Sequence, residues 1–237
     1  MKPLLLSLAL LAAWAPMAAG GPKKPAPALP IPAFDPVGFT AVVDNPYFPL
    51  RPGTILVYEA HGEKTPDLDT VTVTRETRVI LGVAVLGVRT RAWRGGKLSA
   101  ERLDWYAQDR KGSVWHLARD ARVMRDSLVA DTAGTWEAGR DSVSPGIVMP
   151  AVPEVGMEYR HAYRRGVLED IAEVRNLDAK AQAMDQTFTA CVETEEHSEL
   201  GRGTPERRVY APGLGLVSKR TLTGPDVWTR LVKLIAP

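Results

Sequence analysis

The chain has only one cysteine, Cys191, in 237 residues. A single cysteine cannot form a disulfide within its own chain, so a disulfide-stapled fold is excluded and stability must come from packing. Basic residues barely outnumber acidic ones, at 30 against 28. The chain therefore lacks the cationic surplus with which nucleic-acid-binding proteins neutralise phosphates, and we expect no nucleic-acid partner.

Motifs for catalysis and cofactor binding are missing as well. The chain has no His-Glu-x-x-His pair, no phosphate-binding loop, no dinucleotide-binding fingerprint and no Gly-x-Ser-x-Gly elbow. The histidines occur singly, at His61, His116, His161 and His197, so a zinc site would have to be assembled from distant segments. The sequence indicates no particular cofactor, so any cofactor is unknown. It also leaves open whether the protein is an enzyme.

Residues 1–20 have the three parts of a secretory signal peptide: Lys2, an apolar run over residues 4–14 and small residues at 18–20. The apolar run is shorter than the roughly 20 residues that span a bilayer. We therefore expect cleavage, no transmembrane segment in the mature chain, and a periplasmic or extracellular location. Residues 21–36 carry six prolines and predict an extended leader outside the core.

Residues 37–237 are predicted to form a single all-β domain. In residues 70–81, Val71, Val73 and Val79 share one face and the polar residues lie on the other, which favours a half-buried strand. Gly95 and Gly96 suit a tight hairpin turn, and residues 109–112 a second turn. Further strands are expected at residues 83–93, 97–108, 113–119, 158–165, 171–177, 181–185, 188–195, 207–210, 215–222 and 227–235.

These strands predict a single antiparallel meander that forms a barrel or half-barrel. A short N-terminal helix is expected at residues 37–43, because Asp35 offers an N-cap and Pro36 suits the first helical position. Residues 126–153 are irregular, and we interpret them as a long loop across the barrel mouth. The alternative is a boundary between two β subdomains.

Two groups of residues are candidates for ligand binding. Tyr159, His161 and Tyr163 alternate on one predicted strand, and their rings could line a pocket with polar tips pointing inward. Asp104 and Tyr106 share a face of another strand and could form a polar cavity wall. The alternatives are packed core rings with satisfied hydrogen bonds, and a structural cross-strand ion pair of Asp104.

Glu169, Asp170 and Glu173 form the densest acidic group in a β region. In a turn after Gly166 they could bind a hard cation such as calcium, given further oxygen donors. The alternative is a solvated strand edge paired with nearby arginines. Cys191 is either a covered filler residue or an exposed thiol that cross-links two chains.

Four motifs occur in order along the chain. They are Asn-Pro-Tyr-Phe-Pro-Leu at residues 45–50, Asp-Trp-Tyr-Ala-Gln-Asp at 104–109, Pro-Gly-Ile-Val-Met-Pro-Ala at 145–151 and Tyr-Ala-Pro-Gly-Leu-Gly-Leu-Val at 210–217. This series resembles a family of uncharacterised exported bacterial β-rich proteins. The resemblance implies export and a β-rich fold, and it carries no catalytic residue with it.

Three functions remain for such a chain. The first is an exported, non-catalytic binding or scaffold protein that holds a hydrophobic or amphipathic small molecule in a β-barrel. The second is a hydrolase or metal-dependent enzyme that uses the acidic group with His161. The third is an envelope interaction protein that pairs through its leader or an open sheet edge. The oligomeric state is not indicated.

Overall fold

The computed structural model describes residues 29–61, 67–140 and 142–237. The expected signal peptide and the first part of the leader lie outside these residues. The strands are β1 (Ile55–His61), β2 (Asp67–Ile80), β3 (Val83–Arg94), β4 (Lys97–Gln108), β5 (Val114–Arg125), β6 (Leu128–Asp131), β7 (Trp136–Glu137), β8 (Ser144–Met149), β9 (Glu158–Arg164), β10 (Leu168–Ala183), β11 (Gln186–Ser198), β12 (Glu206–Ala211), β13 (Gly215–Thr221) and β14 (Trp228–Ile235).

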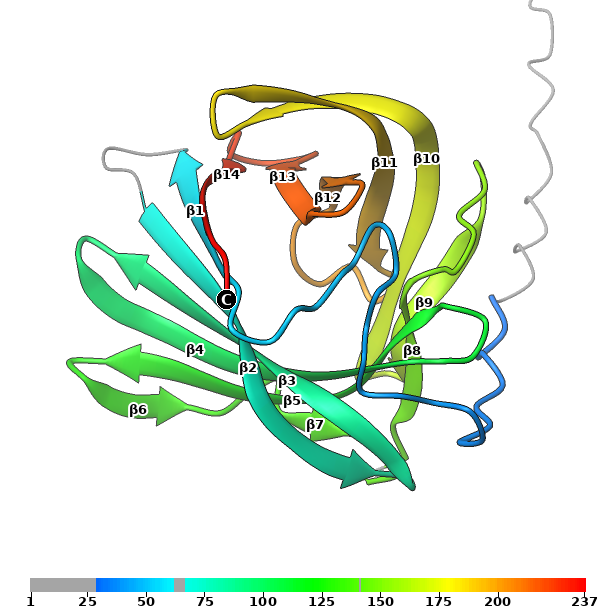
Figure 1. Cartoon of the computed structure of the whole chain (residues 1–237). Coiled ribbons are helices and arrows are strands. Elements are labelled where there is room, and N and C mark those ends of the chain that lie inside the picture. The colour runs from blue at the N-terminus through cyan, green and yellow to red at the C-terminus, as the bar shows by residue number, and fades with distance from the viewer. Residues whose placement is uncertain (1–28, 62–66, 141) are drawn as a thin grey trace, which may run out of the picture.

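Twelve of these strands close into an antiparallel barrel (Figure 1). Neighbours around the barrel are consecutive in the chain except at two places, where β1 pairs with β14 and β5 pairs with β8. β6 and β7 stand outside this ring and pair only with β5. The predicted all-β antiparallel barrel is thus confirmed, and closure removes the open edges that a flat meander would leave.

Two long hairpins extend past the barrel wall and fold onto their neighbours. The tip of the β10–β11 hairpin reaches β14, where the Met184 backbone N–H donates a 3.2 Å hydrogen bond to the Leu231 carbonyl. Along this hairpin, Ala179 and Cys191 are buried in one cluster with Val209. Figure 1 shows the hairpin sweeping over β12 to β14.

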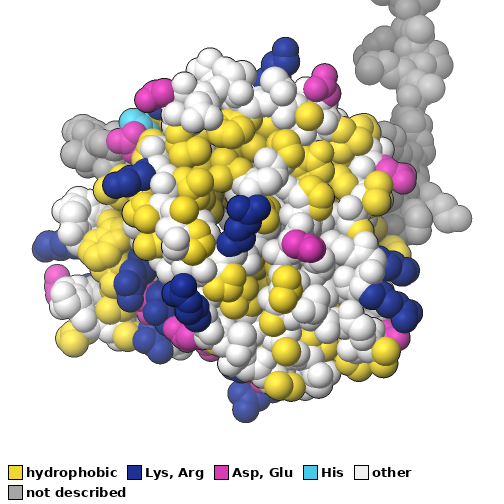
Figure 2. Space-filling view, in the orientation of Figure 1, with side chains coloured by type: hydrophobic (Ala, Val, Ile, Leu, Met, Phe, Trp, Pro, Cys, Tyr) yellow, Lys and Arg dark blue, Asp and Glu magenta, His cyan; other side chains and the backbone are white. Residues whose placement is uncertain are grey.

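The β2–β3 hairpin packs against β4, β5 and β7 in a similar way. The Arg78 guanidinium lies 4.4 Å from the centroid of the Trp105 ring and 3.0 Å from a Glu137 carboxylate oxygen. Ile80 and Val83 join Trp105 in a second buried cluster. Hydrophobic side chains cover much of the face seen in Figure 2, with basic and acidic side chains interspersed.

The predicted helix at residues 37–43 is wrong, because the described chain has no helix. The Asp35 side chain accepts a 3.0 Å hydrogen bond from the Val37 N–H, but a turn follows in which Gly38 has a φ of 87°. Thr40 then exchanges two backbone hydrogen bonds of 2.9 Å with Gln108 at the end of β4. A seven-residue helix has few internal hydrogen bonds, so pairing of this segment with the sheet is more favourable than a helix.

Two further expectations need correction. Residues 126–153 are not a loop across the mouth, since they form β6, β7 and β8, and β8 belongs to the barrel wall. The described end of the leader is not outside the core either. Phe34 lies 5.7 Å from Trp115 between ring centroids and packs against the second cluster.

Candidate functional site

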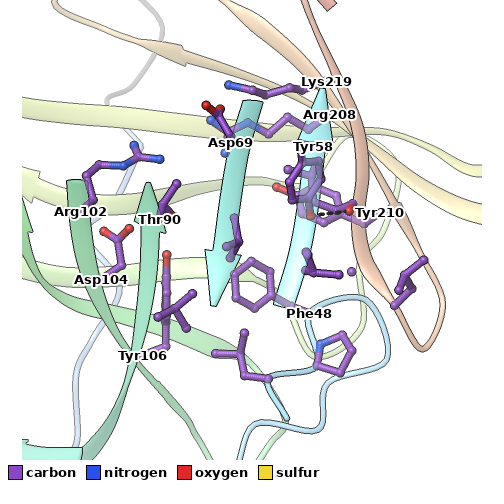
Figure 3. Close-up of a pocket in the computed structure, with 18 of the residues that line it drawn as sticks. Phe48, Tyr58, Asp69, Thr90, Arg102, Asp104, Tyr106, Arg208, Tyr210 and Lys219 are labelled. Carbon is purple, nitrogen blue, oxygen red and sulfur yellow. Dashed lines mark hydrogen bonds between the residues drawn. The ribbon is translucent and has the colours of Figure 1, made fainter. Parts of the chain in front are cut away.

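A chamber of about 200 Å³ lies inside the barrel (Figure 3). Its wall comes from β1 to β5 and from β12 to β14, and the loop before β1 reaches into it. An apolar cavity of about 150 Å³ is large enough to bind benzene. The chamber therefore has room for a small molecule of about one ring.

One side of the chamber is apolar. Its lining side chains are Phe48, Pro49, Leu50, Leu56, Val71, Val88, Leu214 and Leu216. The Phe48 ring centroid lies 5.4 Å from that of Tyr106 on β4 and 6.4 Å from that of Tyr210 on β12. Because Phe48 bridges opposite walls, residues 44–50 act as a plug in the barrel, and we call this segment the plug.

The plug is held by a buried polar network around Asn45. The Asn45 side-chain amide donates hydrogen bonds to the Gly112 carbonyl (2.9 Å) and the Pro150 carbonyl (3.1 Å). Its backbone N–H donates to the Gln108 side-chain oxygen at 2.9 Å. The Gly213 N–H donates to the Pro46 carbonyl at 2.7 Å. The four sequence motifs thus meet around the plug.

Asp104 anchors the polar wall on β4 and β5. One of its carboxylate oxygens lies 2.6 Å from Arg119 Nε and 3.0 Å from His116 Nε2. Burial alone would raise the pKa of Asp104, but Arg119 and His116 hold it well below its usual range. Burial lowers the pKa of His116 despite the opposing effect of Asp104. At neutral pH the wall therefore carries a carboxylate, a guanidinium and a neutral imidazole.

Arg208 on β12 organises a second charged cluster. It contacts a Glu196 carboxylate oxygen at 2.7 Å and a Glu206 oxygen at 2.9 Å. Lys219 Nζ lies 3.1 Å from the other Glu206 oxygen, and the Tyr210 hydroxyl donates a 3.1 Å hydrogen bond to Glu196. Burial opposes the charge on Arg208, yet the carboxylates raise its pKa well above the ordinary value. This cluster is internally balanced.

The predicted aromatic row on β9 does not line the chamber. Tyr159 is buried, and its ring centroid lies 5.8 Å from that of His161, whose Nδ1 is 3.7 Å from Glu196. A register irregularity opposite His161 breaks the alternation, and Tyr163 instead lies under the Arg160 guanidinium at 4.8 Å. Asp104 and Tyr106 both line the chamber.

The alternative, in which these rings are core residues with all their polar atoms hydrogen-bonded, is also not fully met. Among the described residues, neither the Tyr159 hydroxyl nor His161 Nε2 has a hydrogen-bond partner, although both atoms are buried. Burial lowers the pKa of His161, while Glu196 raises it.

The acidic group is spread along β10. Glu169 accepts a 2.6 Å hydrogen bond from the Gly166 N–H, and Glu173 pairs with Arg175. Asp170 points to the opposite face from Glu169, as neighbours in a strand do. Within the described ranges, no three His, Cys, Asp or Glu side chains converge as metal ligands. Glu169, Asp170 and Glu173 therefore form no metal site with His161 in the described part of the chain.

Sequence reasoning missed Arg102, Arg208 and the plug residue Phe48. Arg102 alternates with Asp104 and Tyr106 on β4, so the same period of two could have identified it. Arg208 and Phe48 come from segments far away in the chain, and only closure of the barrel brings them beside β4. No local pattern signals that meeting.

No family model matches the chain, and no curated protein matches it either. One solved structure, a "putative lipoprotein" from Parabacteroides distasonis, aligns with a TM-score of 0.43 at 10% identity, over 80% of this chain and 98% of that one. The part of the chain that the structure describes offers no helix that could span a bilayer.

Proposed function

We propose that this protein is a non-catalytic binding protein that holds a small amphipathic molecule in its barrel chamber. The observation that carries the proposal is the chamber itself, with an apolar side around the plug and a charged wall on β4, β5 and β12. Binding sites for small molecules are commonly concave, mostly apolar and fitted with a few placed polar groups. The chamber has this composition.

The plug adds a second line of support. Asn45 is 2% exposed and fixes the loop through bonds to three separate segments. A fixed loop leaves the space beside Phe48 open without collapse of the wall onto it. Such preorganisation lowers the entropic cost of binding.

The test fills the chamber with a larger side chain from its own wall. Thr90 lines it, so Thr90→Trp places a large ring in the space. Thr72→Trp is the matched control, because Thr72 on the adjacent strand β2 alternates with the chamber residue Val71 and faces away. The probe is toluene, followed by NMR contacts between its protons and the methyl groups of Val88 and Leu216.

We expect these contacts in the wild-type protein and in Thr72→Trp, and their loss in Thr90→Trp. Absence of toluene contacts in the wild type, or their persistence in Thr90→Trp, would count against a binding chamber.

Export is part of this proposal and is supported by the signal-peptide pattern of residues 1–20. The intact mass of protein recovered from producing cells tests it. Cleavage removes the mass of about twenty residues, whereas an uncut chain contradicts export by this route.

A further inference from the structure

Arg102 is the one chamber cation without a carboxylate partner among the described residues. Its guanidinium has neither an ion pair within 4.0 Å nor a hydrogen bond to any described group. The side chain is accessible to solvent although the barrel wall surrounds it. Its cross-strand neighbour Thr90 lines the chamber beside it (Figure 3). Five N–H donors are therefore available to a ligand.

The other cations of the chamber each contact a carboxylate. Arg119 contacts Asp104, Arg208 contacts Glu196 and Glu206, and Lys219 contacts Glu206. The lining carboxylate Asp69 shares Arg94 with Asp67, at 2.8 and 3.3 Å. Among the described residues, Arg102 is thus the chamber cation that lacks a carboxylate within 4.0 Å. The nearby Arg119 guanidinium repels the positive charge of Arg102, so an anion at this point would relieve that repulsion.

Resting on the proposed binding function, we propose that the ligand is a small monocarboxylate. Its carboxylate pairs with Arg102, and its apolar body of about one ring lies against Phe48 and Leu216. The planar guanidinium matches a carboxylate in a two-point geometry. The volume of about 200 Å³ sets the size of the body.

A monoanion fits better than a phosphate ester. A phosphomonoester carries about −1.5 to −2 charges at neutral pH, which exceeds the single positive charge of Arg102. Asp104 lies two residues from Arg102 on the same strand face and would repel the excess charge. The carboxylate is therefore the assigned group.

The experiment compares probes of one size in calorimetric titrations: benzoate, its neutral isostere benzamide, phenyl phosphate and toluene. They are titrated into the full mature protein and three variants. Arg102→Gln removes the charge, and Arg102→Lys keeps it without the planar fork. Arg122→Gln is the matched control, because Arg122 is exposed on β5 beside Ala121, which pairs with Arg102, and has no ion pair among the described residues.

We expect benzoate to bind the wild type about 10- to 100-fold more tightly than benzamide, as a charge-assisted hydrogen bond allows. Arg102→Gln should abolish this preference, because it weakens the binding of benzoate far more than that of benzamide. Arg102→Lys should retain part of it, and Arg122→Gln all of it. Because Arg102 has no partner in the described chain, these variants are expected to melt like the wild type.

Four results would overturn the assignment. Equal affinity for benzoate and benzamide, or a benzoate preference that survives Arg102→Gln, removes the role of Arg102 but leaves the binding function standing if toluene still binds. Tighter binding of phenyl phosphate than of benzoate replaces the carboxylate by a phosphate. Failure of all four probes to bind removes the proposed function together with the inference.

Discussion

Gly146 on β8 lies against the backbone of Arg160 on β9, so closely that a methyl group at Gly146 would overlap the Arg160 carbonyl oxygen. This contact lies where the barrel is most weakly paired, because β8 and β9 share only two register pairs, Ser144 with Tyr163 and Pro145 with Ala162. Only a glycine allows the backbones of β8 and β9 to approach so closely at this point.

Gly146→Ala should therefore lower the free energy of unfolding by about 2–4 kcal/mol, because backbone and not a flexible side chain must move. Urea unfolding followed by tryptophan fluorescence measures the change. Gly87→Ala is the comparison, since its methyl group would meet the side chains of Thr74, Leu103 and Trp105 at 3.0–3.2 Å, which can adjust. Equal costs at the two positions would argue against a backbone contact.

Asn45→Ala should destabilise the protein by about 2–4 kcal/mol, because it leaves the buried Pro150 carbonyl and the Tyr47 N–H without their partner. Asp35→Ala removes only an exposed local hydrogen bond and should change stability by less than about 0.5 kcal/mol. Thermal melts of both variants test this. A melting temperature of Asn45→Ala equal to that of the wild type would mean that the plug is held by apolar contacts alone.

Local sequence patterns predicted the hairpins, but they failed to predict strands in which the alternation of side chains is interrupted. Residues 97–108 were expected as a strand and β4 has these bounds, because the turns at Gly95-Gly96 and at residues 109–112 mark both of its ends. Residues 171–177 and 181–185 were expected as two strands, but residues 168–183 form the single strand β10, whose register with β11 shifts between Asn176 and Ala179. Such irregularities tolerate the polar residues that local reasoning takes for a turn.

β8 was missed for a related reason. Pro145 and Gly146 are typical of a turn, yet here they pair with neighbouring strands. For the site, alternation identified Asp104 and Tyr106. It could not place Arg208 beside them, since the distance between β4 and β12 is set by barrel closure.

The stability of the protein should fall as the pH drops below about 7, because His116 and His161, whose Nε2 atoms are buried, gain protons on unfolding. Burial lowers the folded-state pKa of His116 and of His161, whereas the unfolded value is about 6.5. The unfolded chain thus binds more protons below this pH, and stability rises with pH, by up to about 1.4 kcal/mol per pH unit for each histidine.

Urea unfolding between pH 5 and 8 measures this slope. His161→Gln should reduce it, and His197→Gln, which removes an exposed histidine, controls for the loss of one imidazole. A slope that His161→Gln leaves unchanged would assign the whole effect to other groups.

Cys191 should react slowly with thiol reagents in the folded protein. Its side chain is 0% exposed, and burial raises the pKa of its thiol. Ala190 has a φ of 52°, which interrupts the alternation, and the consecutive residues Cys191 and Val192 are both buried, in two different clusters. Only the thiolate reacts, and it must first reach the reagent by local opening.

We expect modification by a disulfide reagent at least about 100-fold slower in buffer than in denaturant. The control is Thr189→Cys in a Cys191→Ser background, because Thr189 is exposed on the same strand and should react at close to the unfolded rate. Fast labelling of native Cys191 would show that the β10–β11 hairpin lifts readily from β14. In that case the thiol could also cross-link two chains, which a buried Cys191 excludes.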